Sequence, residues 1–327
     1  MTADCRDIAI IGAGMAGLSA GQALRAAGHR VQVFDKSRSS GGRLCTRRGE
    51  GWQADHGAQY FTARDPLFEA EVQRWLGAGA AAQWTPRLVT LGGDGGHRLD
   101  PAVRRYIGTP RMGAPVRLVG DGLPLQTQAT ITALHRDRDR WQLTSAEQGL
   151  LPAAFDTVLL ALPAAQAAAL LATTDSPLAA LARGVTMRGC WSLMLRFALR
   201  VDVDFDAAFV NEGPLGWIAR DSSKPGRGSR ETWVAQATAQ WSQQHIEATP
   251  DQVLAELLPA FAGWTGALPL ESSAHRWRYA DCEQPAKVGS VWSATEQLGL
   301  CGDWLNGGRV EGAWLSGRHL AAQLLAP

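Results

Sequence analysis

The chain has few lysines, few cysteines and no long apolar stretch. Its 327 residues carry 32 Lys and Arg against 31 Asp and Glu, and so near-neutral a charge argues against nucleic acid as the main partner. No apolar run approaches the roughly 18 residues of a membrane-spanning helix, and residues 4–7, before the first strand, are polar and charged. We therefore expect a cytoplasmic protein without a membrane segment.

The cysteines have the spacing of neither a disulfide framework nor a zinc site. They are odd in number, widely separated and without a CxxC pair: Cys5, Cys45, Cys190, Cys282 and Cys301. Such usage is typical of reduced thiols, and Cys301, at the end of an apolar strand, is expected to be a small buried hydrophobe. The seven histidines show no ligand spacing, so the sequence predicts no metal site.

Glycine, by contrast, stands where a nucleotide needs it. An apolar strand at residues 8–11 breaks into a turn with Gly12, Gly14 and Gly17, and a helix of small residues follows through Ala27. Gly12 allows the tight turn, Gly14 lets the backbone touch a pyrophosphate, and Gly17 lets the helix lie close to the strand. A side chain at Gly14 would therefore occupy the phosphate site.

A second strand at residues 31–34 leads to a fixed acid and then to a fixed cation. The strand ends at Asp35, about 20 residues beyond the glycines, where a carboxylate accepts hydrogen bonds from an adenosine ribose. Residues 39–43 form another glycine turn, which ends in Arg43. This turn is suited to closing over the same diphosphate.

The strand-then-glycine pattern recurs at the other end of the chain. Residues 298–303 repeat it, and residues 307–313 open the last helix. A nicotinamide domain needs only the first motif, whereas a bound flavin dinucleotide needs both. The sequence therefore predicts FAD as the cofactor. A second GxGxxG between a strand and a helix is missing, which disfavours an enzyme with a dedicated NAD(P)H domain.

Several of these motifs resemble the flavin-containing amine oxidase superfamily. They are GAGMAGLSA at 12–20, the GGR at 41–43, DHGAQYFTARDP at 55–66 and CGDWLNGGRVEGAWLSG at 301–317. Within the superfamily, the stretches at 55–66, 232–242 and 274–280 are most similar to the bacterial renalases. The resemblance spans nearly the whole chain.

The resemblance implies an α/β fold with two parts. The first is a discontinuous, glutathione-reductase-type Rossmann domain that binds FAD, at residues 1–76, 101–163 and 295–327. The second is an α+β substrate domain built on an antiparallel sheet, at 77–100 and 164–294. The composition agrees, because an apolar strand-like run at 156–163 ends at a proline and seven of the thirteen tryptophans follow between 164 and 294.

Local patterns predict the main elements of both parts. Helices are expected at 66–76 and at 247–262, the second capped by Thr249 with proline in its first turn. Alternating runs predict strands at 127–134, 140–144, 190–199 and 232–241. The stretch 77–100 is rich in glycine and alanine, with a turn at 92–96 between short strands and a return segment at 98–105.

The resemblance also assigns residues to the cofactor. Asp303 matches the position that holds the ribityl or phosphate end, Ile131 the position of a backbone contact to adenine, and the last helix directs its first N–H groups at the flavin. We favour a flavin-side role for Arg309 over a surface ion pair. The full predicted set is Gly12, Ala13, Gly14, Met15, Ala16, Gly17, Asp35, Lys36, Gly42, Arg43, Ala58, Gln59, Tyr60, Phe61, Ile131, Gly302, Asp303, Arg309, Val310, Glu311, Gly312 and Ala313.

The substrate side rests on aromatic residues beside the renalase-like stretches. Most of the tryptophans are expected to pack the core, because tryptophan is a large apolar filler. The residues predicted to face the flavin across the domain cleft are Tyr60, Trp233, Arg276, Trp277 and Tyr279. Whether the flavin is covalently held, through a cysteine or His56, stays open, as does the oligomeric state.

The three lysines bear on the choice of substrate. Many amine oxidases pair a lysine with flavin N5, but Lys36 follows the ribose acid, Lys224 lies in a polar loop and Lys287 in a turn. None is an obvious match. The loop at 220–230 carries several cations, which could meet the diphosphate of a nucleotide substrate, although a solvated hairpin is the favoured interpretation.

Together these features predict a renalase-like FAD oxidase. Its substrates would be the 2- and 6-dihydro isomers of NAD(P)H, which give hydride to flavin N5 without a base because aromatic NAD(P)⁺ is regained. Oxygen would reoxidise the flavin and release hydrogen peroxide. A conventional flavin amine oxidase or desaturase is the alternative, and a flavin-binding regulatory protein without turnover is a third hypothesis.

Overall fold

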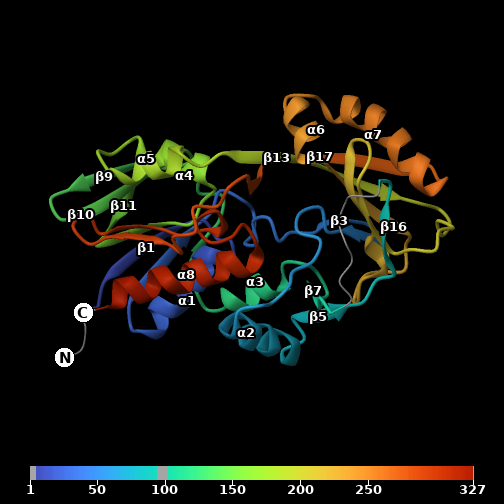
Figure 1. Cartoon of the computed structure of the whole chain (residues 1–327). Coiled ribbons are helices and arrows are strands. Elements are labelled where there is room, and N and C mark those ends of the chain that lie inside the picture. The colour runs from blue at the N-terminus through green and yellow to red at the C-terminus, as the bar shows by residue number, and fades with distance from the viewer. Residues whose placement is uncertain (1–4, 94–101, 327) are drawn as a thin grey trace.

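Two six-stranded sheets form the framework of the computed structural model, which describes residues 5–93 and 102–326. A three-stranded sheet and two short ribbons accompany them. Figure 1 shows that the first and last parts of the chain fold together, while the second sheet lies beside them with α6 and α7 on its outer side.

The first sheet has the strand order β18-β19-β12-β1-β2-β8. Its strands are β1 (Asp7–Ile11), β2 (Arg30–Phe34), β8 (Leu125–Gln126), β12 (Thr157–Leu160), β18 (Val291–Ser293) and β19 (Leu298–Leu300). Neighbouring strands are parallel except β18 and β19, which are antiparallel. β1 and β12 are buried almost throughout, as expected of a parallel sheet covered on both faces.

Successive residues of β1 belong to two different cores. Ile8 and Ile10 pack with α1 (Met15–Ala26) and α8 (Val310–Leu325), which lie side by side (Figure 1). Ala9 and Ile11 pack on the other face. The elements on that face are α4 (Ala164–Leu171), α5 (Leu178–Arg183), β9 (Ile131–Asp137), β10 (Arg140–Ser145) and β11 (Gly149–Phe155). Because neighbouring side chains of a strand point to opposite faces, the sheet separates these cores.

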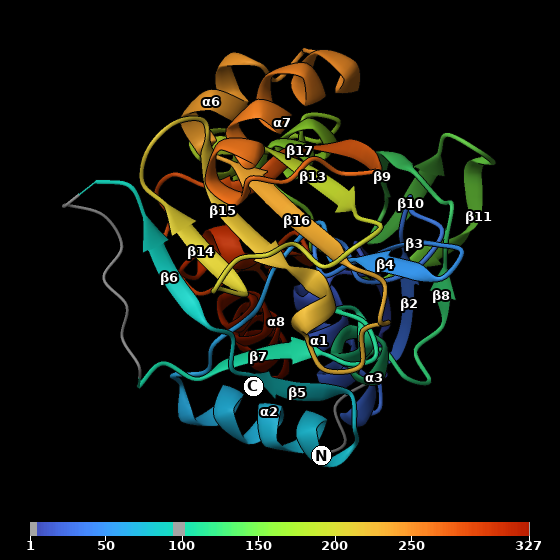
Figure 2. The same ribbon diagram turned by 90° about the vertical axis from the view of Figure 1, so that its right-hand side faces the viewer.

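The second sheet has the order β17-β13-β16-β15-β14-β6. Its strands are β6 (Leu88–Leu91), β13 (Met187–Arg196), β14 (Ala207–Val210), β15 (Leu215–Arg220), β16 (Thr232–Ala237) and β17 (Glu271–Cys282). All pairs are antiparallel except β6 with β14. Helices α6 (Ala239–Gln244) and α7 (Pro250–Thr265) cover one face (Figure 2). The strand orders of the two sheets confirm the predicted fold class.

Smaller elements connect the sheets, and two predicted helix starts are confirmed. The elements are β3 (Arg47–Gly49), β4 (Trp52–Ala54), α2 (Pro66–Gly77), β5 (Ala81–Trp84), β7 (Arg105–Gly108), α3 (Ala114–Val119) and the 3-10 turns η1 (Asp221–Ser223) and η2 (Asp303–Leu305). The Thr249 hydroxyl accepts from the Gln252 N–H at 3.3 Å, and the Gln252 side chain accepts from the Thr249 N–H at 2.9 Å. This capping box starts α7 where the sequence predicts.

Three predicted strands have the wrong bounds, and the one expected at 190–199 is β13, which begins at Met187 and ends at Arg196. The strand expected at 232–241 ends at Ala237, because the Thr238 hydroxyl accepts from the Trp241 N–H at 3.2 Å and begins α6. The strand expected at 127–134 begins only at Ile131. Parts of the predicted turn at 92–96 and return segment at 98–105 lie outside the described residues. The division into two domains stays a prediction.

Candidate cofactor and substrate site

A cavity of about 1450 Å³ runs between the carboxyl ends of the parallel strands and the start of the second sheet. Its lining includes the glycine turn after β1, the turn at 41–43, the stretch at 56–61, strand β17 and the start of α8. This volume exceeds the roughly 300–1,000 Å³ of a pocket for one small molecule. The cavity therefore has room for a cofactor and a substrate together.

The three glycines of the first turn have different surroundings. A Cβ on Gly12, where φ is +111°, would collide with the Ala161 carbonyl oxygen, and one on Gly17 with the Gly12 carbonyl oxygen. A Cβ on Gly14 would meet nothing within 4 Å and would project into the cavity. The open space beside Gly14 is the cradle that a pyrophosphate at a helix N-terminus requires. The residues present fit a dinucleotide.

Asp35 is held rigidly at the end of β2. One carboxylate oxygen accepts from the Ala13 N–H at 2.7 Å and the other from the Ser37 N–H at 2.7 Å. Asp35, Lys36 and Ile131 line the same cavity as the glycine turn. A fixed carboxylate beside the phosphate cradle suits a ribose hydroxyl.

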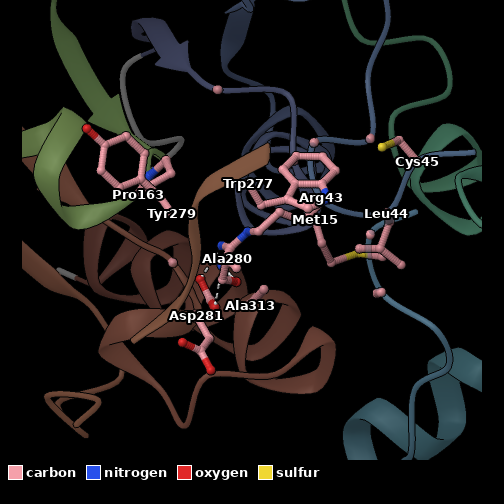
Figure 3. Close-up of a pocket in the computed structure, with 18 of the residues that line it drawn as sticks. Met15, Arg43, Leu44, Cys45, Pro163, Trp277, Tyr279, Ala280, Asp281 and Ala313 are labelled. Carbon is pink, nitrogen blue, oxygen red and sulfur yellow. Dashed lines mark hydrogen bonds and ion pairs between the residues drawn. The ribbon is translucent and has the colours of Figure 1, made fainter. Parts of the chain in front are cut away.

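Arg43 connects three segments at the middle of the cavity. Its guanidinium donates to both oxygens of Asp303, at 2.5 and 3.0 Å, and to the Ala280 carbonyl oxygen of β17 at 2.9 Å. Burial alone would lower the pKa of Arg43, but the Asp303 carboxylate raises it above its ordinary value. Figure 3 shows Arg43 beside Trp277, with Cys45 and Leu44 on one side and Tyr279 on the other.

The N-terminus of α8 faces the cavity through part of its first turn. Gly308, Arg309, Val310 and Ala313 line the wall. Glu311 instead accepts from the backbone N–H groups of residues 64 and 65, at 2.6 and 2.7 Å. The helix thus presents free N–H groups and a partial positive charge to whatever the cavity holds.

Three aromatic rings form one wall of the cavity. Trp277 stacks on His56 with ring centroids 5.3 Å apart, and His275 meets both rings edge-on at 4.6 and 4.7 Å. The Trp277 indole N–H donates to the His56 carbonyl oxygen at 2.8 Å. Burial lowers the pKa of His56 to about 4 and also lowers that of His275. Both imidazoles are therefore neutral near pH 7, and we call this group of three rings the aromatic wall.

Most of the predicted site residues line this cavity. From the cofactor set they are Gly12, Gly14, Met15, Ala16, Asp35, Lys36, Gly42, Arg43, Ala58, Tyr60, Phe61, Ile131, Gly302, Asp303, Arg309, Val310 and Ala313, and from the substrate set Tyr60, Arg276, Trp277 and Tyr279. Ala13, Gly17, Gln59, Glu311 and Gly312 do not line it. Gly17 and Gly312 instead allow close backbone packing, because a Cβ on either would strike a carbonyl oxygen.

The placement of Trp233 at the flavin is wrong. Its ring is fully buried between Phe205 and Phe261 in the core under α7, and its indole N–H donates to Glu231 at 2.8 Å. Gln236 lies three residues after Trp233 in the same strand. It faces the cavity and donates to the Gly57 carbonyl oxygen at 2.8 Å. Strand alternation puts the two residues on opposite faces of the sheet.

Three of the four cations in the loop at 220–230 have buried side chains rather than solvated ones, whereas Arg230 is exposed. The side chains of Arg220, Lys224 and Arg227 are at most 3% exposed and pair with carboxylates whose side chains are at most 12% exposed. None of the three lines the cavity. The loop therefore offers these cations neither to solvent nor to a diphosphate in the cavity.

Sequence reasoning missed several lining residues. They are Cys45, Arg64, Arg105, Cys190, Gln236 and His275, and His56, considered only for a covalent flavin link. His275 stands two residues before Trp277 in a predicted strand, so alternation could have placed both on the same face. The others are brought in by tertiary contacts between distant segments, for which a single sequence gives no signal.

Charge in the cavity is unevenly balanced. Among the described residues that line it, seven are cations and three are carboxylates: Lys36, Arg43, Arg64, Arg105, Arg276, Arg278 and Arg309 against Asp35, Asp281 and Asp303. Arg276 and Arg278 share one carboxylate, Glu247, at the rim. The site therefore attracts anions.

Comparisons with known proteins agree with this geometry. Residues 10–75 match the NAD(P)-binding Rossmann-like domain. An L-amino-acid oxidase of Echis ocellatus is 48% identical over 58 residues, which cover 17% of this chain and 12% of that protein. One from Siganus canaliculatus is 37% identical over 84 residues, covering 25% of this chain and 15% of that protein. The sequence matches thus span a small part of these relatives.

Solved structures match over nearly the whole chain. A putative protoporphyrinogen oxidase from Exiguobacterium sp. 255-15 has a TM-score of 0.76 at 11% identity and covers 97% of this chain and 98% of its own. Cyclohexylamine oxidase from Brevibacterium oxydans IH-35A has a TM-score of 0.76 at 13% identity, with 98% of both chains covered. The chain therefore shares the fold of these two oxidases. Putrescine oxidase shares it, with a TM-score of 0.72 at 13% identity.

The matched Rossmann segment and the fold shared with these oxidases support FAD as the cofactor of this cavity. One cavity is lined by the two glycine motifs, Arg43 and the start of α8, so a single extended dinucleotide can contact all of them. In the described part of the chain, no helix is both long and apolar enough to cross a membrane. Nor do these residues include a group of three or more metal-ligating side chains.

Proposed function

We propose that this protein is a renalase-like FAD oxidase that acts on the 2- and 6-dihydro isomers of NAD(P)H. Bound in this cavity, FAD would supply a hydride acceptor that oxygen can reoxidise, so that the products would be NAD(P)⁺ and hydrogen peroxide. The protein's own contribution is to bind, orient and shield the reactants.

The observation that carries this proposal is the surplus of cations around the cavity. Seven cations face three carboxylates among the described lining residues, and a bound FAD diphosphate would offset only part of that surplus. An ammonium substrate would meet repulsion here, whereas a nucleotide diphosphate would be attracted. Arg276 and Arg278 at the rim are suited to phosphate oxygens, because guanidinium binds them through two parallel hydrogen bonds.

The aromatic wall suits a planar ring. Trp277, His56 and His275 offer flat surfaces on which a dihydropyridine stacks. Because both imidazoles are neutral near pH 7, they add no further positive charge beside the pyridinium ring that oxidation of the dihydronicotinamide produces. The wall therefore holds the ring without opposing its oxidation.

The cavity offers no lysine base at this end. Among the described lining residues the single lysine is Lys36, next to the ribose acid Asp35. Hydride loss from a dihydropyridine requires no base, since aromaticity is regained. Oxidation of a dihydronicotinamide therefore does not depend on a lysine base, which the described lining residues lack at this end of the cavity.

Anaerobic rapid mixing of the flavin-loaded protein tests the proposal. The reductants are 2- and 6-dihydro-NAD, ordinary NADH, putrescine, cyclohexylamine and an L-amino acid, and the signal is the bleaching of flavin absorbance. We expect fast bleaching by the dihydro isomers alone. Bleaching by amines alone would overturn the proposal in favour of a flavin amine oxidase, and a flavin that no reductant bleaches would favour a regulatory protein.

A matched pair of reductants tests the role of the cations. An N-alkyl dihydronicotinamide offers the same hydride but carries no phosphate. We expect it to reduce the flavin at least about tenfold less efficiently than the dinucleotide, because charge-assisted hydrogen bonds to the diphosphate are lost. Equal efficiency would show that the rim arginines do not bind substrate.

A further inference from the structure

The loop that contains η1 carries two cations into the interior of the protein. The side chains of Lys224, Asp55 and Asp221 are 0% exposed, and that of Arg227 is 1% exposed. Lys224 Nζ lies 2.7 Å from Asp221 Oδ1 and 3.1 Å from Asp55 Oδ2. Two cations and two carboxylates thus form a closed, neutral group, which we call the buried charge cluster.

Arg227 and Thr46 complete the hydrogen bonds of Asp55. Arg227 Nη2 donates to Asp55 Oδ2 at 2.5 Å, and the Thr46 hydroxyl donates to Asp55 Oδ1 at 2.6 Å. Burial would raise the pKa of Asp55, but Lys224 and Arg227 hold it below its ordinary value. Asp55 is therefore ionised inside the protein, and Lys224 faces a true carboxylate.

The third contact of Lys224 leads to the cavity. Its Nζ lies 3.4 Å from Gln59 Oε1, which also accepts from the Trp217 indole N–H at 3.4 Å. The Gln59 amide nitrogen in turn donates to the carbonyl oxygens of Asp55 and Gly57. Gln59 is thus fixed at both ends of its amide, with Lys224 and Trp217 holding the oxygen and two backbone carbonyl groups holding the nitrogen.

Gln59 lies within the stretch that forms the cavity wall. Gly57, Ala58 and Tyr60 line the cavity, whereas Gln59 between them points back into the charge cluster. Tyr60 packs on Trp217 and Trp84, with ring centroids 5.6 and 6.5 Å apart. The Lys224 ammonium lies 5.5 Å from the centre of the Trp84 ring. The two rings that support Tyr60 from behind therefore contact Gln59 or Lys224 themselves, in addition to the hydrogen bond from Gln236 to the Gly57 carbonyl oxygen.

We propose that Lys224 is a positioning residue that holds Gln59, and through it residues 57–60, in the place where they line the flavin site. The inference rests on the flavin site of the proposed function but not on the identity of the substrate. It also assigns a purpose to the cluster, because taking four charges out of water is unfavourable and a buried ion pair often stabilises a core less than well-packed apolar residues would.

The chain contains a matched control for the loss of a buried cation. Arg220 is 3% exposed, pairs with Glu231 and Asp206 and lies over the Trp233 ring at 4.8 Å. It begins the same loop but contacts no residue of the cavity wall among its described partners. Arg220→Met and Lys224→Met therefore remove comparable charges at different distances from the cavity.

The experiment compares these two variants with the parent as flavin-loaded full-length proteins. The readouts are the dissociation constant of FAD, the visible absorbance and circular dichroism of the bound flavin, and the thermal midpoint with and without FAD. We expect both variants to lower the midpoint, and Lys224→Met alone to change the flavin spectrum and weaken FAD binding by about tenfold. Equal destabilisation with the parent's flavin spectrum and affinity in both would overturn the proposal.

A second variant keeps the test decisive if Lys224→Met does not fold. Gln59→Met keeps all four charges and their pairs but removes the amide between Lys224 and residues 57–60. The same spectral change and weaker FAD binding are expected, and a parent-like flavin in Gln59→Met would overturn the proposal. Because the readouts use no substrate, a parent that binds flavin yet oxidises no dihydronicotinamide would refute only the proposed substrate.

Discussion

Arg43 and Asp303 form a two-point ion pair across 260 residues of sequence. Arg43 ends the second glycine turn, and Asp303 begins η2, just before α8. The same guanidinium binds the Ala280 carbonyl oxygen on β17 at 2.9 Å. The pair therefore joins both cofactor motifs to a strand of the second sheet at the centre of the cavity.

Removing the Asp303 charge should weaken the cofactor site. In Asp303→Asn the ion pair is lost and Arg43 is free to turn away, so we expect the dissociation constant of FAD to rise by at least about tenfold. Titration of the apoprotein with FAD, followed by flavin fluorescence, measures it. Asp7→Asn, which breaks an exposed pair with Arg30 at the far end of β1, is the control and should leave FAD binding unchanged. An unaltered affinity in Asp303→Asn would contradict our assignment.

Two glycines of the first turn should respond in opposite ways to a side chain. Gly14→Val places its side chain in the open cavity, so the protein should fold with the parent's thermal midpoint but stay colourless. Gly17→Ala drives its Cβ against the Gly12 carbonyl oxygen, and such overpacking should cost about 1–3 kcal/mol or more of the free energy of unfolding. Purification of a yellow Gly14→Val protein would disprove the phosphate cradle.

Two tryptophans from the renalase-like stretches should separate into core and cavity roles. Trp233→Ala removes a fully buried ring and should lower the free energy of unfolding by about 3–5 kcal/mol. Trp277→Ala opens the aromatic wall and should mainly slow flavin reduction by substrate. Urea unfolding and anaerobic flavin reduction of both variants give the comparison. A Trp277→Ala protein that is as unstable as Trp233→Ala would place Trp277 in the core instead.

Acid should destabilise the protein through His56. Burial first, and then the nearby His275 and Arg47, lower the pKa of His56 from 6.5 to about 4. Between those values the unfolded chain binds a proton at His56 that the folded chain does not. The free energy of unfolding is therefore unaffected above pH 6.5 and falls by up to about 3 kcal/mol as the pH drops toward 4.

Urea unfolding at several pH values between 7 and 4 measures this effect. In His56→Gln the acid-dependent loss should be smaller than in the parent by the His56 share. His135→Gln, at an exposed position, is the control and should lose stability as the parent does. Parallel curves for the parent and His56→Gln would show that His56 is not held neutral.

The sequence predicts those features that depend only on residues close together in the chain. The turn at Gly12, Gly14 and Gly17 follows from an apolar strand broken by glycines, and the cap at Thr249 from one hydroxyl beside a proline. The residues that form each of these features are neighbours in the sequence, so the feature can be predicted from the sequence alone. The predicted end of β16 is wrong because Thr238, which the alternating pattern assigned to the strand, instead caps the following helix.

The sequence did not predict which face of a strand some side chains occupy or which residues they contact. Trp233 and Gln236 share one strand, and only the packing of that strand between α7 and the cavity decides which of them faces the flavin site. The cations of the loop at 220–230 looked solvated because charged loops usually are. Lys224 and Arg227 instead pair with the buried carboxylate of Asp55, which lies some 170 residues earlier in the chain.

The sequence by itself determined that glycine turns suited to a dinucleotide lie near both ends of the chain, because backbone N–H groups and missing side chains are local properties. Only the tertiary structure decided that Arg43 meets Asp303, that His56 and His275 join Trp277 in one wall, and that Lys224 is buried against Asp55. These contacts depend on how the two sheets pack, and packing is settled by the sum of many weak interactions spread over the whole chain.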